Sequence, residues 1–279
     1  METKEIVRTR GGAFLLQETQ AENVFTPEDF SEEQQMMRDA VKEFIDREVW
    51  PNKHRFEQKD YDFTFELMRK AGELGFLGVG VPEAYGGLEM GFVSTMLVCD
   101  YFSGATGSLS TAYGAHTGIG IMPIVLYGTE EQKQKYVPKL ASGEEIGCYC
   151  LTEPGAGSDA NSGKTKAVLS EDGTHYKISG QKIWISNAGY ASVMIVFARI
   201  EDDKNITGFI VPNDPENGIS MGEEEHKLGI HASSTRQVFF SETKVPVENM
   251  LSERGNGFKI AMNALNVGRI KLAVACIDA

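Results

Sequence analysis

Cysteine is scarce in this sequence. Only four of the 279 residues are cysteines, and they are scattered over Cys99, Cys148, Cys150 and Cys276. That number is too small for the disulfide framework of a secreted domain. Cys148 and Cys150 share one face of a predicted strand, which invites a metal site, but no second Cys or His pair with ligand spacing accompanies them. Buried free thiols are the better interpretation.

Long apolar runs are missing as well. No run approaches the roughly 18 residues of a membrane span, so the sequence predicts no transmembrane segment. The first residues, Met1 to Lys4, lack the apolar core of a signal peptide and the Arg-rich, acid-poor character of a transit peptide. These features favour a cytoplasmic location.

The chain also lacks an excess of positive charge. Its 27 Lys and Arg residues face 40 Asp and Glu residues, which gives a formal net charge of −13. Such a field repels polyanions, so we expect no nucleic-acid partner. A small anionic cofactor remains compatible with it, because backbone amides and a few basic groups can hold phosphates locally.

What is present divides into a helical block and a β block. Residues 1–25 form a poorly specified arm. Capping boxes that begin at Ser31 and Thr129, together with helical periodicity, predict an all-α domain over residues 26–143. Its first helix is expected to stop at Pro51. Residues 144–252 are predicted to form an antiparallel β-barrel, because short β-favouring runs alternate with turn residues. The fold class is therefore α+β, with a returning helical period over residues 253–279. The predicted strands are Gly147–Thr152, Lys164–Leu169, His175–Ile178, Val193–Ala198, Thr207–Val211, Ile219–Met221 and Gln237–Phe240.

The densest cluster of unusual residues runs from Cys148 to Asp159. Its letters, CYCLTEPGAGSD, describe a strand that enters a tight Gly-Ala-Gly turn ending in Ser-Asp. Small residues allow a ligand close to the backbone, and exposed amides with a serine hydroxyl can bind phosphate oxygens. When the stretch is considered alone, an ordinary surface turn is the simpler interpretation. It matches neither the Walker motif nor the Gly-x-Gly-x-x-Gly motif.

A second cluster, GQKIWISNAG over residues 180–189, contains Trp184, one of only two tryptophans. An indole beside a hydroxyl residue on a strand could stack on a planar cofactor while the hydroxyl binds the cofactor's edge. Core packing is the simpler alternative when the stretch is considered alone.

Together the two clusters closely resemble the acyl-CoA dehydrogenase family. The run from Tyr149 to Asp159 is similar to the family's first signature, and GQKIWISN follows at the usual distance. Further matching stretches occur in the same order, from about Phe25 to the last residue. They are YGTEEQK at 127–133, GF at 208–209, KLGI at 227–230, STR at 234–236 and VPVEN at 245–249.

The resemblance implies an FAD-dependent enzyme that desaturates an acyl-CoA between its α and β carbons. It places the flavin between the barrel and a C-terminal helical bundle. Thr152 would lie near flavin N5, Ser158 beside the pyrophosphate and the thioester arm, and Trp184 with Ser186 on the other side of the flavin. The full set of expected cofactor contacts is Tyr149, Leu151, Thr152, Gly157, Ser158, Trp184, Ile185 and Ser186.

The catalytic base is not found in this sequence. The family places a Glu either in the C-terminal bundle or in the turn before an Arg, and the residue before Arg269 here is Gly268. The sequence therefore predicts a first helix of a truncated bundle, with the base outside it and no dehydrogenase turnover by this chain alone. Arg269 and Asn266 are expected near the substrate.

The length of acyl chain that the enzyme prefers is predicted from the same resemblance. The stretches around Gly114, Ala115 and Arg269 resemble the very-long-chain subfamily. Gly114 and Ala115 would leave a deep tunnel, because shorter-chain members place bulkier side chains at its end. We therefore expect substrate contacts from Ser158, Asn266, Arg269, Gly114 and Ala115, and a preference for long acyl chains.

Partners and alternatives follow from the same resemblance. Electrons would pass to an electron-transfer flavoprotein, and the full-length protein would form a homo-oligomer. The alternatives are an acyl-CoA oxidase, in which oxygen reoxidises the flavin, and a non-catalytic flavin- or acyl-CoA-binding remnant. A purely structural module is the poorest interpretation, because it treats Trp184 and the Thr-Glu-Pro-Gly turn as packing accidents.

Overall fold

The computed structural model describes residues 8–277, so the predicted arm and the last predicted segment lie partly outside the described residues. The described part of the arm carries short 3-10 helices, η1 (Gly11–Leu15) and η2 (Ala21–Asn23), with no buried residue. An ion pair of 2.6 Å between Arg8 and Asp29 ties this segment to the start of the helical domain. Within residues 8–277, no helix is both long and apolar enough to cross a membrane.

The first long helix, α1 (Glu32–Phe44), begins at the predicted capping box, where Ser31 Oγ accepts a hydrogen bond from the Gln34 amide. The helical run continues as the π-helix η4 (Ile45–Val49) and ends in the 3-10 turn η5 (Trp50–Asn52), which contains Pro51. Asn52 then leaves the helical region, with a φ of −108° and a ψ of 6°, and a short helix that was not predicted, α2 (Lys53–Glu57), follows. Pro51 lies in the first turn of η5, where the missing N–H has no intrahelical partner to lose.

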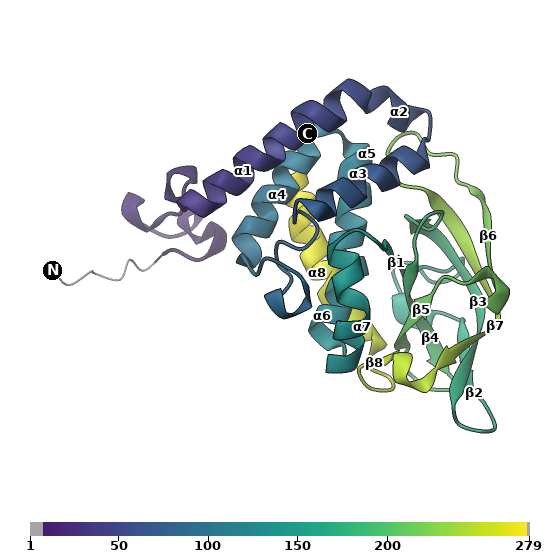
Figure 1. Cartoon of the computed structure of the whole chain (residues 1–279). Coiled ribbons are helices and arrows are strands. Elements are labelled where there is room, and N and C mark those ends of the chain that lie inside the picture. The colour runs from purple at the N-terminus through teal and green to yellow at the C-terminus, as the bar shows by residue number, and fades with distance from the viewer. Residues whose placement is uncertain (1–7, 278–279) are drawn as a thin grey trace.

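The remaining helices lie beside the sheet domain (Figure 1) and divide between two apolar cores. One core includes residues of α3 (Tyr61–Glu73), α4 (Gly91–Ala105) and α5 (Gly107–Gly114). The other is shared with the sheet and includes residues of α6 (Met122–Tyr127), α7 (Glu130–Ala141) and α8 (Gly257–Ala275). Gly75, with a φ of +82°, ends α3 in a backbone conformation that glycine adopts without strain. The last helix, α8, returns from the sheet domain into the helical domain and contacts α4, α5 and α6. The short helical segments of this domain are η3 (Pro27–Asp29), η6 (Glu83–Tyr85) and the π-helix η7 (Ala115–Gly120).

The second domain is an eight-stranded sheet with the order β6-β7-β3-β2-β4-β5-β8, and β1 pairs with β4. All seven predicted strands form, with β3 and β7 much longer than predicted, and β8 is additional. The strands are β1 (Gly147–Cys150), β2 (Lys166–Leu169), β3 (His175–Ser186), β4 (Val193–Ile200), β5 (Thr207–Pro212), β6 (Ile219–Glu224), β7 (Thr235–Pro246) and β8 (Met250–Leu251).

A helical domain followed by a sheet domain is therefore confirmed, but two parts of the barrel prediction are wrong. The sheet is mixed, because β1 and β2 both run parallel to β4. It is also not closed, because its path ends at β6 and β8, which do not pair with each other. Strand-forming runs and turns in a sequence indicate how many strands there are. Whether two strands pair parallel or antiparallel depends instead on the path of the chain between them, which for β2 and β4 includes β3.

Two buried polar residues fasten the helical domain to the sheet. His116 in η7 bonds the Leu140 carbonyl through Nε2 at 2.9 Å and accepts the Gly147 amide at Nδ1 at 3.0 Å. Burial lowers the pKa of His116 to about 4, so the ring is neutral and can accept at one nitrogen while it donates at the other. Asn187, at the end of β3, donates to the Ala112 carbonyl of α5 at 2.9 Å. These contacts fix the seam in which the site lies.

Candidate functional site

A cavity of about 360 Å³ lies where the sheet meets α8. All eight residues predicted to bind the cofactor line it. The sequence order alone could not establish this, because β1 and the end of β3 are separated by more than thirty residues. The cavity is lined by Ile119, Tyr149, Leu151, Thr152, Gly157, Ser158, Ala160, Trp184, Ile185, Ser186, Met262, Leu265 and Arg269.

One wall is formed by β1 and the loop after it. Tyr149 packs edge-on against Phe197, with ring centroids 5.0 Å apart, and is buried. Beyond the strand, the backbone groups of Glu153 and Ala156 exchange two hydrogen bonds of 3.1 Å, which close the tight turn expected from the Pro-Gly-Ala-Gly letters. This turn directs the exposed residues Gly157 and Ser158 to the mouth of the cavity.

The second wall is a bulge near the end of β3. The register with β7 shifts between Lys182 and Ile185, and Trp184 adopts a φ of +56°. Positive φ is uncommon for a bulky residue and is costly, so it persists only where the surroundings impose it. The bulge leaves the Trp184 side chain 64% exposed at the cavity instead of packed in the core. Bulges of this kind re-aim a side chain beside functional sites.

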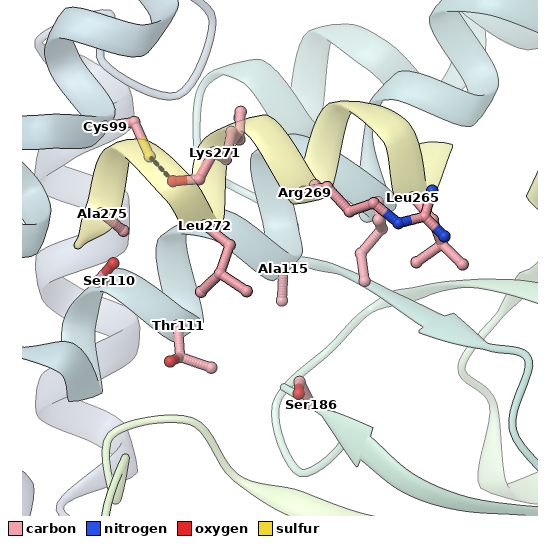
Figure 2. Close-up of a pocket in the computed structure, with 13 residues that line it drawn as sticks. Cys99, Ser110, Thr111, Ala115, Ser186, Leu265, Arg269, Lys271, Leu272 and Ala275 are labelled. Carbon is pink, nitrogen blue, oxygen red and sulfur yellow. Dashed lines mark hydrogen bonds between the residues drawn. The ribbon is translucent and has the colours of Figure 1, made fainter. Parts of the chain in front are cut away.

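A second cavity, of about 380 Å³, continues the first along α8. The two share Ile119, Ser186, Leu265 and Arg269 as lining residues. Figure 2 shows Leu272, Ala115 and Thr111 pointing into the space between the helices and the sheet, with Ser186 on the sheet side. The second cavity is lined by Cys99, Ser110, Thr111, Gly114, Ala115, Ile119, Ser186, Leu265, Gly268, Arg269, Lys271, Leu272 and Ala275.

The predicted substrate residues are only partly brought together. Gly114, Ala115 and Arg269 line the second cavity, and Ser158 lines the first. Asn266 lines neither of these two cavities; its Oδ1 accepts a hydrogen bond of 2.6 Å from Arg269 Nη1. Asn266 is thus placed to orient the guanidinium group rather than to contact a ligand in either cavity.

Polar groups are available in the first cavity. The hydroxyls of Thr152, Ser158 and Ser186 make no side-chain hydrogen bond within residues 8–277 and are free to bind a ligand. No Asp or Glu is among the described residues that line either cavity, so these walls hold no carboxylate base. Gly268, at the position where part of the resembled family carries one, has no side chain.

No group of three metal-ligating side chains occurs in residues 8–277. Cys148 and Cys150 are buried free thiols with their sulfurs 4.0 Å apart. The hydrogen bond between the two thiols and burial both raise the pKa of Cys148, so this thiol is held protonated.

Comparisons with known proteins agree with this geometry. The chain matches the N-terminal domain of acyl-CoA dehydrogenases over residues 31–144 and their middle domain over residues 148–243. It is 48% identical to a probable acyl-CoA dehydrogenase of Bacillus subtilis over 97% of this chain. It belongs to the acyl-CoA dehydrogenase family.

Two further family members bear on the site. A Bacillus anthracis acyl-CoA dehydrogenase solved with FAD superposes on 97% of this chain with a TM-score of 0.91 and 48% identity. A Clostridium acetobutylicum acyl-CoA dehydrogenase named short-chain specific is 40% identical over 88% of this chain. The chain spans about half the length of the two Bacillus proteins, 45% and 46%, and 64% of the Clostridium protein.

Several residues that line the two cavities of this family member were not predicted. The α8 residues Leu265, Gly268, Leu272 and Ala275 recur at helical spacing, so the apolar period of this helix carried a usable signal. Cys99, Ser110 and Thr111 gave no signal in the sequence, because α4 and α5 are apolar on several faces. Ile119 lies in the π-helix η7, an irregularity that often marks functional sites and is invisible in sequence periodicity.

Proposed function

We propose that this chain forms the FAD-binding wall and the acyl-binding cleft of an enzyme that desaturates acyl-CoA thioesters. The observation that supports this most is the meeting of all eight predicted cofactor residues around one cavity that continues into a second, largely apolar one. A planar ligand with a polar edge in the first cavity would then adjoin an extended apolar ligand in the second.

The residues present fit FAD. The exposed indole of Trp184 offers a flat face, and the unengaged hydroxyls of Thr152 and Ser186 lie beside it to bind a heterocycle's polar edge. Ser158 follows the Gly-Ala-Gly turn, where it can bind phosphate oxygens. When bound, FAD would supply the acceptor for the hydrogen removed from the substrate's β carbon.

The chain's own residues would orient the substrate and exclude water. Arg269 lines both cavities and would place its positive charge beside the thioester end of an acyl-CoA. Because no carboxylate lines either cavity, the α-proton must be removed by a group outside these walls. We therefore expect this chain to bind FAD and acyl-CoA without turnover, and reduction of bound FAD by an acyl-CoA would refute that expectation.

Preference for a long acyl chain remains part of the proposal. Gly114 and Ala115 line the second cavity and fill little of it, which supports a deep cleft. A relative named short-chain specific argues the other way. Rates with palmitoyl-CoA and butyryl-CoA on the full-length enzyme distinguish the two, and faster butyryl-CoA turnover would reject the long-chain preference.

We expect an electron-transfer flavoprotein as the electron acceptor and a homo-oligomer for the full-length enzyme, as the family resemblance implies. Peroxide release during turnover would identify an oxidase instead. If the full-length protein bound neither FAD nor acyl-CoA, both a dehydrogenase and an oxidase would be rejected.

The decisive experiment is FAD titration of wild type and a Trp184→Gly variant, followed by flavin absorption and fluorescence. Glycine accepts the φ of +56°, so folding should be unharmed, whereas loss of the indole should weaken FAD binding by about tenfold or more. Trp50→Ala, at the only other tryptophan, is the matched control, because Trp50 lies in η5 and lines neither cavity. Wild type that binds no FAD, or equal affinity in the Trp184 variant, would reject the assignment.

A further inference from the structure

The two walls of the first cavity are joined from behind by a buried ion pair that does not itself line the cavity. Lys182 Nζ lies 2.7 Å from Glu153 Oε1, and the two side chains are 1% and 7% exposed. Lys182 belongs to β3, two residues before Trp184, and Glu153 belongs to the loop between Thr152 and Ser158. Each partner is therefore part of a different wall.

Lys182 also bonds a backbone carbonyl of the first wall. Its ammonium group donates a second hydrogen bond, of 3.1 Å, to the carbonyl of Leu151, a residue that lines the cavity. Next to it, the Ile183 amide donates to the Thr152 carbonyl at 2.9 Å. Two consecutive residues of β3 thus donate hydrogen bonds to two consecutive carbonyls of the first wall, next to Trp184.

Glu153 fixes the same loop at its other end. Its carboxylate accepts the amides of Lys164, at 2.5 Å, and Thr165, at 3.0 Å, which precede β2. Burial opposes its ionisation, but the charge of Lys182 and these hydrogen bonds hold the pKa of Glu153 below its ordinary value. The carboxylate is therefore charged and connects three segments at one point.

The free-energy cost of removing these two charges from water argues against a role in stabilising the fold alone. Two charges taken out of water contribute little net stability compared with an apolar pair of similar volume, and their best-attested benefit is a defined geometry. The Lys182–Glu153 pair lies where such geometry matters, between the strand carrying Trp184 and the loop carrying Thr152 and Ser158.

We propose that Lys182 and Glu153 are positioning residues that set the separation of the two cavity walls and thereby the tightness with which FAD is held. This inference rests on the proposed FAD site. It assigns neither residue a contact with the cofactor. The pair acts through the Leu151 carbonyl and through the turn that presents Ser158.

The test is a neutral double variant, Lys182→Met/Glu153→Gln. It removes both charges together, keeps an acceptor for the amides of Lys164 and Thr165, and removes the donor to Leu151. We expect the dissociation constant for FAD to rise at least tenfold while the unfolding midpoint without FAD changes by only a few degrees. Hydrogen–deuterium exchange should rise in residues 151–158 and 183–186 and stay unchanged in residues 175–181.

A matched control lies on the same strand. Lys177 and Glu242 form an exposed pair 3.8 Å apart, so Lys177→Met/Glu242→Gln should leave the FAD dissociation constant within twofold of wild type. If the buried double variant does not fold, Glu153→Asp serves instead. It keeps both charges but shortens the link by one methylene, and a severalfold weaker FAD affinity is expected.

The outcomes separate the two proposals. Wild type that binds no FAD rejects the proposed function, and the exchange measurement then still tests whether the pair orders the loop. Wild type that binds FAD while the double variant binds it equally well, with unchanged exchange, overturns the positioning role alone. An unfolding midpoint that falls in step with FAD affinity shows a general stability role and also overturns it.

Discussion

Two lysines are buried among the described residues, one in each domain, and they are treated differently by their surroundings. Lys182 in the sheet faces the Glu153 carboxylate at 2.7 Å. Lys271 in α8 is 4% exposed and donates 2.7 Å to the Thr117 hydroxyl, with the Tyr113 ring 5.5 Å away and no carboxylate within ion-pair distance among residues 8–277. The pair in the sheet neutralises its charges, whereas the helical domain keeps one that is not neutralised.

The difference appears in how each lysine titrates. Burial lowers the pKa of both, and at Lys182 the charge of Glu153 opposes the effect. At Lys271 burial dominates and lowers the pKa to about 8. A buried charge is therefore tolerated in two ways: by a paired carboxylate that ties segments together, or by easier loss of the proton.

The largest effect is expected from breaking the pair on one side. Lys182→Met leaves the buried Glu153 carboxylate without its counter-charge, which should lower the free energy of unfolding by about 3–5 kcal/mol. Urea unfolding at pH 7 measures this. A loss below about 1 kcal/mol would mean that water or another cation reaches Glu153 and that the pair is not isolated.

Lys271→Met should have the opposite sign, because it removes a charge that burial disfavours. The shift from 10.5 to about 8 corresponds to about 3 kcal/mol, so the variant should be more stable than wild type at pH 7 by up to that amount. The advantage should persist below pH 8 and disappear as pH rises to 10.5, because the unfolded chain binds the extra proton in that window and wild type gains stability there. A constant difference across this pH range would contradict the assignment.

A smaller effect is expected from removing the hydroxyl that Lys271 uses. Thr117→Val should lower stability by about 1–2 kcal/mol at pH 7, since a buried hydrogen bond to a charged group is lost. The Lys271→Met background provides the control, because the same Thr117 change should cost clearly less there. Equal costs in both backgrounds would show that Thr117 acts only through its bond to the Tyr113 carbonyl.

The smallest effect on stability is expected from replacing an exposed lysine. Lys177 lies on the same strand as Lys182 but is exposed, so Lys177→Met should change stability by less than about 0.5 kcal/mol. A much larger loss would show that position on β3, rather than burial, makes a lysine costly to replace.

Much of the fold could be predicted from the sequence because its signals are local. The capping boxes at Ser31 and Thr129 placed the starts of α1 and α7, and all seven predicted β runs formed strands. Strand direction was not predictable: the parallel pairing of β4 with β1 and β2 depends on how distant segments return, which no local pattern encodes. The short helix α2 after Pro51 was also missed, because a proline in the first turn of a helical segment does not prevent another helix from following it.

The sequence by itself determined which residues are chemically suited to the site: the turn from Thr152 to Ser158 and the indole of Trp184 are recognisable from their letters and order. Only the tertiary structure decided that these segments line one cavity, that a bulge leaves Trp184 exposed there, and that Lys182 reaches Glu153 without lining the cavity itself. The physical reason is that backbone propensity and turn chemistry act over a few residues. The distances between walls are set instead by strand pairing and by buried polar contacts between residues far apart in the chain.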